Sequence, residues 1–173
     1  WIELFQQEIQ LPSRKLDRLL RWESYTVGER IANSIILYSC KDITPSQKIQ
    51  KALIEQVKLL ITKMEYFGAH TGNHVINNAR AIYLAGVYFQ CEPWRKFAEL
   101  IFRRELPLLV SSDGFLREGS THYQFLFTRW ILEILFFVEA VYDDQLKSFL
   151  IPYVQNLLQK CSFFGANLES NHP

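Results

Sequence analysis

The sequence Asp113-Gly-Phe-Leu-Arg-Glu-Gly-Ser-Thr-His-Tyr123 lies between two strongly apolar segments and is itself crowded with polar side chains. It holds two carboxylates, one arginine, two hydroxyls, one histidine and one phenol. Asp113-Gly114 is typical of a turn because glycine accepts a positive φ, and Ser120-Thr121 offers hydroxyl caps for a new helix. The stretch therefore predicts a helix end, a turn and a helix start, with its polar groups gathered at a helix entrance.

A second polar segment also stands where a helix is predicted to begin. Asn73-His74 precedes an apolar-periodic run that contains Asn77 in its first turn. An Asn–His pair supplies one neutral amide and one group that titrates near neutral pH. We call residues 72–78 the Asn73 segment and residues 113–123 the Tyr123 segment.

Each polar segment, taken singly, has a simple structural interpretation. Asn73 is a good helix N-cap, and a capped connection between helices with a solvated face explains most of the Tyr123 segment. Two such segments, each at the mouth of a long helix, are harder to explain by capping alone. We therefore predict that Asn73, His74, Arg117 and Tyr123 converge on one side of a curved helical array.

Composition and charge narrow the class of protein. The chain has 173 residues, of which 49% are hydrophobic and 21% charged, as in one globular domain with a sizeable core. Its formal net charge of +1 and the lack of a long basic run disfavour nucleic acid as a partner. The most apolar stretch, residues 125–142, contains Arg129, Glu133 and Glu139, which favour a buried helix over a membrane span.

The sequence gives no signal for a metal, a disulfide framework or a nucleotide. Cys40, Cys91 and Cys161 are far apart and lack the spacing of metal ligands, so buried free thiols are the expected state. Glycine-rich phosphate loops and nucleophile-elbow patterns are absent. The chain begins at Trp1 and stops just after a predicted helix, from which we expect a fragment of a larger protein.

Hydrophobic periodicity of the helical type runs through the chain, and alternation of period two is not convincing anywhere. A Thr26-x-x-Glu29 capping box and the sequence Thr44-Pro45-Ser46-Gln47 each predict a helix start, the second with Thr44 as cap and Pro45 at the first helical position. The other predicted helices cover residues 1–10, 13–22, 73–89, 92–107, 125–142 and 145–164. The predicted class is all-α, built of antiparallel helix pairs with short connections.

Arg30 lies in the first turn of a predicted helix, where a cation opposes the helix dipole. We therefore expect a carboxylate from another part of the chain beside it, and Glu118 is one candidate.

The order of the motifs resembles the heparinase II/III-like polysaccharide lyases, whose helical toroid is similar to that of alginate lyases. The resemblance covers most of the chain. It rests on the following residues: Gly72-Asn-His-Val-Ile-Asn-Asn78, Ala85-Gly-Val-Tyr-Phe89, Trp94, Asp113-Gly114 and Arg117-Glu118-x-Ser120-x-x-Tyr123, with Trp22-x-x-Tyr25 and Glu29-Arg30 upstream.

The resemblance implies an incomplete (α/α) toroid whose concave cleft binds an acidic polysaccharide, followed by a β-sandwich domain beyond residue 173. It also implies a periplasmic or secreted location. By the same resemblance, Asn73 matches the carboxylate-neutralising asparagine and Tyr123 the catalytic tyrosine. His74 matches a position used for binding or proton transfer. Asn77 departs from the pattern because many relatives carry glutamate there, and a later histidine that several members need lies outside this sequence, so we expect an incomplete site.

These residue types suit β-elimination from a uronic acid. Removal of the C5 proton requires the adjacent carboxylate to be neutralised as the enediolate develops, which Asn73 can do by hydrogen bonding. His74 or Arg117 adds positive character beside that carboxylate. A base must accept the C5 proton and an acid must protonate the leaving oxygen. Tyr123 is the best candidate for the acid, and its use in both steps stays open. We expect Arg117, Glu118 and His122 to contact the substrate. This scheme requires no metal or cofactor.

Three other functions remain open. A uronyl C5-epimerase shares the proton abstraction but returns the proton to the opposite face of the sugar. A non-catalytic helical toroid would bind the polymer without turnover. A helical scaffold for protein partners would leave the two polar segments unexplained.

Overall fold

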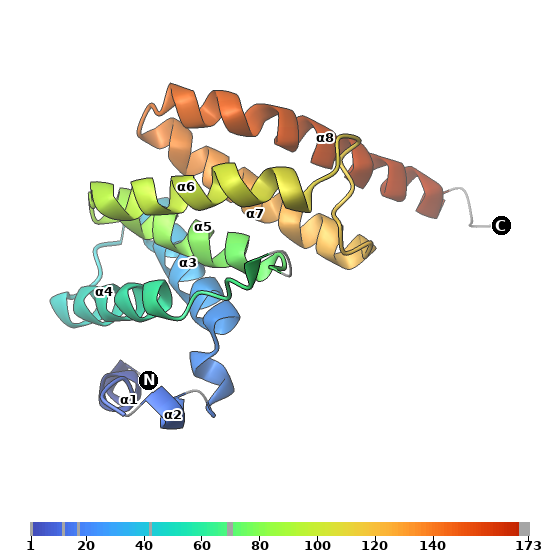
Figure 1. The fold of residues 1–173 in the computed structure, drawn as a ribbon. Coiled ribbons are helices and arrows are strands. Elements are labelled where there is room, and N and C mark those ends of the chain that lie inside the picture. The colour runs from blue at the N-terminus through green and yellow to red at the C-terminus, as the bar shows by residue number, and fades with distance from the viewer. Residues whose placement is uncertain (1, 12, 17, 42, 69–70, 170–173) are drawn as a thin grey trace.

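The computed structural model describes residues 2–11, 13–16, 18–41, 43–68 and 71–169, and these form an all-helical fold (Figure 1). Its elements are α1 (Ile2–Glu8), α2 (Ser13–Leu16), the 3₁₀ turn η1 (Leu20–Trp22), α3 (Ser24–Cys40), α4 (Gln47–Thr62), α5 (His74–Tyr88), α6 (Glu92–Leu109), α7 (Thr121–Ala140) and α8 (Asp144–Glu169). The predicted all-α class is confirmed, and the arrangement is consistent with a helical fragment of an (α/α) toroid.

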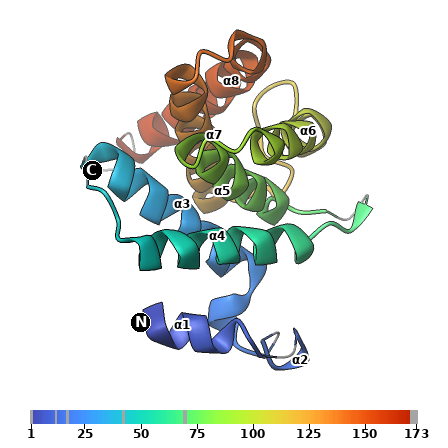
Figure 2. The same ribbon diagram turned by 90° about the vertical axis from the view of Figure 1, so that its left-hand side faces the viewer.

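Helix α5 is the centre of the fold. It packs against α3, α6 and α7, and Figure 2 shows it end-on with α3, α4, α6 and α7 around it. Every residue from Val75 to Gly86 is buried. Small residues permit this close packing: a Cβ added at Gly86 would lie 2.9 Å from the backbone nitrogen of Arg95 in α6. The polar groups of α5 are therefore either buried within the bundle or confined to its N-terminal end.

The connection between α6 and α7 is held tightly. Its backbone folds back on itself at an isolated antiparallel bridge between Val110 and Leu116. The buried amide of Gln124 accepts a hydrogen bond from the Leu116 N–H (2.9 Å) and donates one to the Gly114 carbonyl (2.8 Å). Gly114 has φ +88° and lies directly against the backbone of Asn156 in α8. The Tyr123 segment is thus a fixed structure rather than a loose loop.

Two predicted helix starts are wrong in detail. Helix α3 begins at Ser24, so Thr26 lies within its first turn and Glu29 does not form a capping box. Helix α4 begins at Gln47, and its cap is Ser46, whose hydroxyl accepts the N–H of Ile49. In the first case tertiary contacts determine where Glu29 points, and in the second a nearer hydroxyl replaces the predicted cap.

One carboxylate joins α1 to the η1 turn. Glu8 of α1 accepts hydrogen bonds from the guanidinium of Arg21 and from the indole N–H of Trp22 (2.7 Å). These bonds lower the pKa of Glu8 to about 2. The first two predicted helices are shorter than expected, since α1 ends at Glu8 and the second predicted helix is divided into α2 and η1.

The predicted pairing of Arg30 with Glu118 is wrong. Arg30 donates instead to the side-chain oxygen of Gln56 (2.6 Å) and to the carbonyl of Arg21 (2.9 Å). Its guanidinium also lies over the ring of Trp22, 5.2 Å from the centroid. Burial lowers the pKa of Arg30 to about 10, against the opposing effect of Glu8. Neutral oxygen acceptors and the rings of Phe5 and Trp22 contact this cation.

None of the helices in the described part of the chain is both long enough and apolar enough to cross a membrane.

Candidate functional site

The two polar segments meet at the N-terminal end of α5. Glu118 Oε1 accepts a hydrogen bond from the backbone N–H of Asn73 (3.1 Å), and Oε2 accepts one from the Asn73 side-chain amide (2.9 Å). Asn73 occupies the N-cap position, but its side chain makes no capping hydrogen bond. It is 2% exposed, whereas Glu118 is exposed. The Asn73 donors are therefore directed at a carboxylate rather than at the helix.

A second bond joins the same two regions. Arg117 donates a hydrogen bond from its guanidinium to the carbonyl of Thr71, just before the Asn73 segment. The backbone N–H of Arg117 donates to the Leu109 carbonyl (2.8 Å), which ties the residue to the end of α6. Arg117 and Glu118 thus brace the entrance of α5 from neighbouring positions in the chain.

His74, the first residue of α5, is held by a carboxylate and an aromatic ring. Its Nδ1 lies 2.9 Å from Oε2 of Glu65, in the segment between α4 and α5. The other carboxylate oxygen of Glu65 accepts the hydroxyl proton of Ser24. The Tyr25 ring lies against the imidazole, with centroids 4.8 Å apart. The segment after α4 and the start of α3 therefore both orient this histidine.

Tyr123 lies in the first turn of α7, where Ser120 caps the helix by accepting the Tyr123 N–H. Its side chain is 39% exposed, and its ring packs edge-on against His122, which is exposed. Burial raises the pKa of the nearby Tyr25 phenol above its usual value, and Glu29 adds to that shift.

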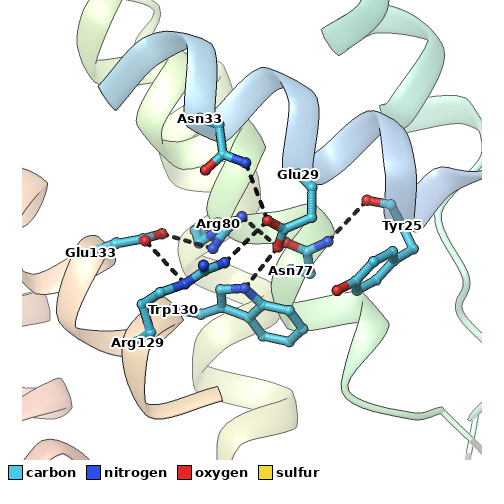
Figure 3. A network of polar contacts seen from close by, with 8 residues as sticks. All are labelled: Tyr25, Glu29, Asn33, Asn77, Arg80, Arg129, Trp130 and Glu133. Carbon is cyan, nitrogen blue, oxygen red and sulfur yellow. Dashed lines mark hydrogen bonds and ion pairs between the residues drawn. The ribbon is translucent and has the colours of Figure 1, made fainter. Parts of the chain in front are cut away.

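Beside Tyr25 lies a polar network that joins α3, α5 and α7 (Figure 3). Its centre is Glu29, which accepts hydrogen bonds from Arg80 (2.9 Å), the indole N–H of Trp130 (2.8 Å) and Arg129 (3.1 Å). Glu133 accepts a second bond from Arg80 (2.7 Å). Arg80 itself has no solvent exposure.

Burial dominates the electrostatics of this network. It raises the pKa of Glu133 and lowers that of Arg80, in each case against the opposing effect of the ionic partners. Taken together, Glu29, Glu133, Arg80 and Arg129 balance two negative and two positive charges. A network of this kind, with no net charge and many hydrogen bonds, holds α3, α5 and α7 rigidly together near Tyr25.

A separate hydrogen bond beside this network ties α5 to the start of α3. Asn77, fully buried in α5, donates its amide proton to the carbonyl of Tyr25 (3.1 Å). Asn77 therefore helps to fix the start of α3. The ring of Tyr25 also lies 6.1 Å from that of Trp130, centroid to centroid.

Of the four residues predicted to converge, Asn73 and Arg117 lie in segments that direct contacts join, through Glu118 and the Thr71 carbonyl. The convergence of Tyr123 with His74 and Asn73 stays a prediction. The chemical roles assigned to these residues remain predictions. Sequence reasoning missed Glu65 and Tyr25. Glu65 carries no local motif, and Tyr25 stands out in the sequence only within the upstream Trp22-x-x-Tyr25 pattern.

The described residues contain no group of three or more His, Cys, Asp or Glu side chains arranged to hold a metal ion. Comparison with known families gives one informative result. Residues 1–170 match the model of a family described as Heparinase II/III N-terminus. Searches of curated proteins and of solved structures find no match.

Proposed function

We propose that this chain, which belongs to the heparinase II/III N-terminus family, forms the helical part of a polysaccharide lyase that cleaves uronic-acid-containing polymers by β-elimination. Membership of the family supports the polysaccharide lyase class. The contact that joins Asn73 with Glu118 is the observation that carries the assignment of the site to these two segments.

That contact indicates what Asn73 can bind. Its backbone N–H and side-chain amide already hold a carboxylate, that of Glu118, at 3.1 and 2.9 Å. The exposed Glu118 side chain can swing aside, and a uronate carboxylate can then take its place on the same donors. Hydrogen bonds of this kind strengthen as the enediolate develops, so they lower the barrier rather than merely bind the substrate.

The proton transfers fall to His74 and Tyr123. His74 Nε2 takes the C5 proton, and the electron pair of that C–H bond forms the C4–C5 double bond. The C4–O bond breaks with its electron pair on the leaving oxygen, which receives the proton of the Tyr123 hydroxyl. Proton return from the imidazolium to the phenolate through solvent restores both groups. Arg117 and His122 both lie in the Tyr123 segment and can contact the polymer.

The rest of the catalytic unit belongs to the proposal as well. We assign residues 1–173 to one helical domain and place a β-sandwich domain beyond residue 173. A further histidine from that region would complete the site. The experiment therefore uses the protein at its full natural length.

The test compares Tyr123→Phe with Tyr142→Phe, the same substitution at a residue that is 88% exposed in the turn between α7 and α8. The assay is the ultraviolet absorbance of unsaturated uronate across a panel of uronic-acid polymers. We expect Tyr123→Phe to reduce turnover by roughly a hundred- to ten-thousandfold, and Asn73→Ala by roughly a hundred- to thousandfold. Tyr142→Phe should match the wild type.

Three results would overturn this assignment. Unchanged turnover in Tyr123→Phe would remove Tyr123 from the site. Exchange of the C5 proton without a new double bond would identify an epimerase. Binding of a uronate polymer without any turnover would identify a carbohydrate-binding domain.

A further inference from the structure

Glu65 contacts His74, the residue that accepts the C5 proton in the proposed function. One carboxylate oxygen lies 2.9 Å from His74 Nδ1, and the other accepts the Ser24 hydroxyl proton. The side chains of Glu65 and His74 are 27% and 37% exposed. Neither is therefore withdrawn into the core, and the pair lies at the protein surface near Tyr25.

The chemistry of this contact determines the tautomer of His74. An ionised carboxylate can only accept hydrogen bonds, so Nδ1 must carry a proton when it faces Glu65. In the neutral imidazole the lone pair is then on Nε2, which has no hydrogen-bond partner among the residues that the structure describes. Since Ser24 donates to Glu65, the carboxylate is also held in place from its far side.

We propose that Glu65 is a positioning residue that fixes His74 as the Nδ1–H tautomer and leaves Nε2 available to accept the C5 proton. The inference rests on the proposed function and deepens it. When Nε2 accepts a proton, the carboxylate 2.9 Å from Nδ1 stabilises the imidazolium that forms. Tyr25 keeps the ring plane from turning because it packs against one side of the imidazole.

The first measurement of this proposal does not depend on activity. Two-bond ¹H–¹⁵N spectra of histidine-labelled protein at alkaline pH distinguish the nitrogen that carries the proton from the one that does not. The His74 signals are assigned by their loss in His74→Gln. We expect Nδ1–H in the wild type and a shift of population toward Nε2–H in Glu65→Ala. Glu55→Ala serves as control, because Glu55 pairs with Lys58 on α4 rather than with His74.

The second measurement separates positioning from binding. Glu65→Ala should lower kcat by roughly ten- to a thousandfold and leave KM within about twofold, a smaller loss than the roughly ten-thousandfold seen when a catalytic triad loses its orienting carboxylate. Glu65→Gln keeps an acceptor but can also present its NH₂ group to Nδ1, so we expect an intermediate loss of kcat and a mixture of tautomers. Glu55→Ala should match the wild type.

The outcomes distinguish this proposal from the proposed function. If Tyr123→Phe and Asn73→Ala lose activity while Glu65→Ala keeps both its kcat and the Nδ1–H tautomer, the role of Glu65 is overturned. Should the wild type cleave none of the polymers, the proposed function fails, and the spectra still decide whether Glu65 orients His74. A wild-type Nε2–H tautomer overturns the proposal whatever the activity.

Discussion

The carboxylate of Glu118 accepts hydrogen bonds from both the backbone N–H and the side-chain amide of Asn73, 45 residues earlier in the chain. This pair joins the entrance of α5 to the loop that precedes α7. The Glu118 carboxylate thus occupies the same Asn73 donors that would bind a substrate carboxylate in the proposed function.

A double-mutant cycle with Asn73→Ala and Glu118→Ala should measure this relationship. Asn73→Ala removes the amide but keeps the backbone N–H, so the coupling reports only the side-chain bond. We expect a coupling free energy of roughly 1–2 kcal/mol in urea unfolding. The same cycle on the exposed pair Glu3–Lys48 should give no measurable coupling. Additive effects of Asn73→Ala and Glu118→Ala would contradict the contact.

Arg80→Met should be among the most damaging substitutions of a charged residue in this chain. Arg80 is fully buried between Glu29 and Glu133, so its removal leaves two partly buried carboxylates without their main partner. The free energy of unfolding should fall by roughly 3–5 kcal/mol. Arg103→Met, which breaks a partly exposed pair within α6, should cost less than about 1 kcal/mol. If the two substitutions lowered the free energy of unfolding by similar amounts, the buried network would not be a main source of stability.

Two glycines of the α6–α7 loop should respond differently to alanine. Both have positive φ, +88° at Gly114 and +66° at Gly119. An added Cβ at Gly114 would lie 2.3 Å from the carbonyl oxygen of Asn156, whereas at Gly119 it would meet nothing within 4 Å. Gly119→Ala should therefore cost about 1–2 kcal/mol for backbone strain alone, and Gly114→Ala a further ~1–3 kcal/mol for the clash. Thermal unfolding of both variants measures the difference, and equal costs would refute the contact with Asn156.

Glu8 should make the stability of the chain depend on acidity. Its pKa is lowered from 4.5 to about 2 by the hydrogen bonds from Arg21 and Trp22, so the folded state favours the ionised form. The stabilisation is complete above pH 4.5 and is lost as the pH falls toward about 2. Glu8→Gln should thus be less stable than the wild type at neutral pH, and the difference should shrink across this window. Urea unfolding at a series of pH values measures it, and a difference that does not change with pH would contradict the assignment.

Local sequence patterns were enough to predict the all-α class and the position of most helices. Apolar residues at helical spacing, Pro93 at the start of α6 and the hydroxyl of Ser120 before α7 are local signals, because helix formation and capping depend on residues a few positions apart. The two polar segments also stand out as local patterns. The order of their motifs resembles the heparinase II/III-like family, and the family match over residues 1–170 confirms this resemblance.

Which polar groups contact one another depends on how the helices pack. No sequence pattern distinguishes Arg80 within its apolar helix. Its partners, Glu29 of α3 and Glu133 of α7, reach its guanidinium only in the folded chain. Glu65 likewise has no motif, and its contact with His74 depends on how the segment after α4 returns to α5. Such contacts form because burying α5 brings side chains distant in sequence to within hydrogen-bond distance, and a buried charge is stable only with its partners. The spacing of residues within one helix does not contain that information.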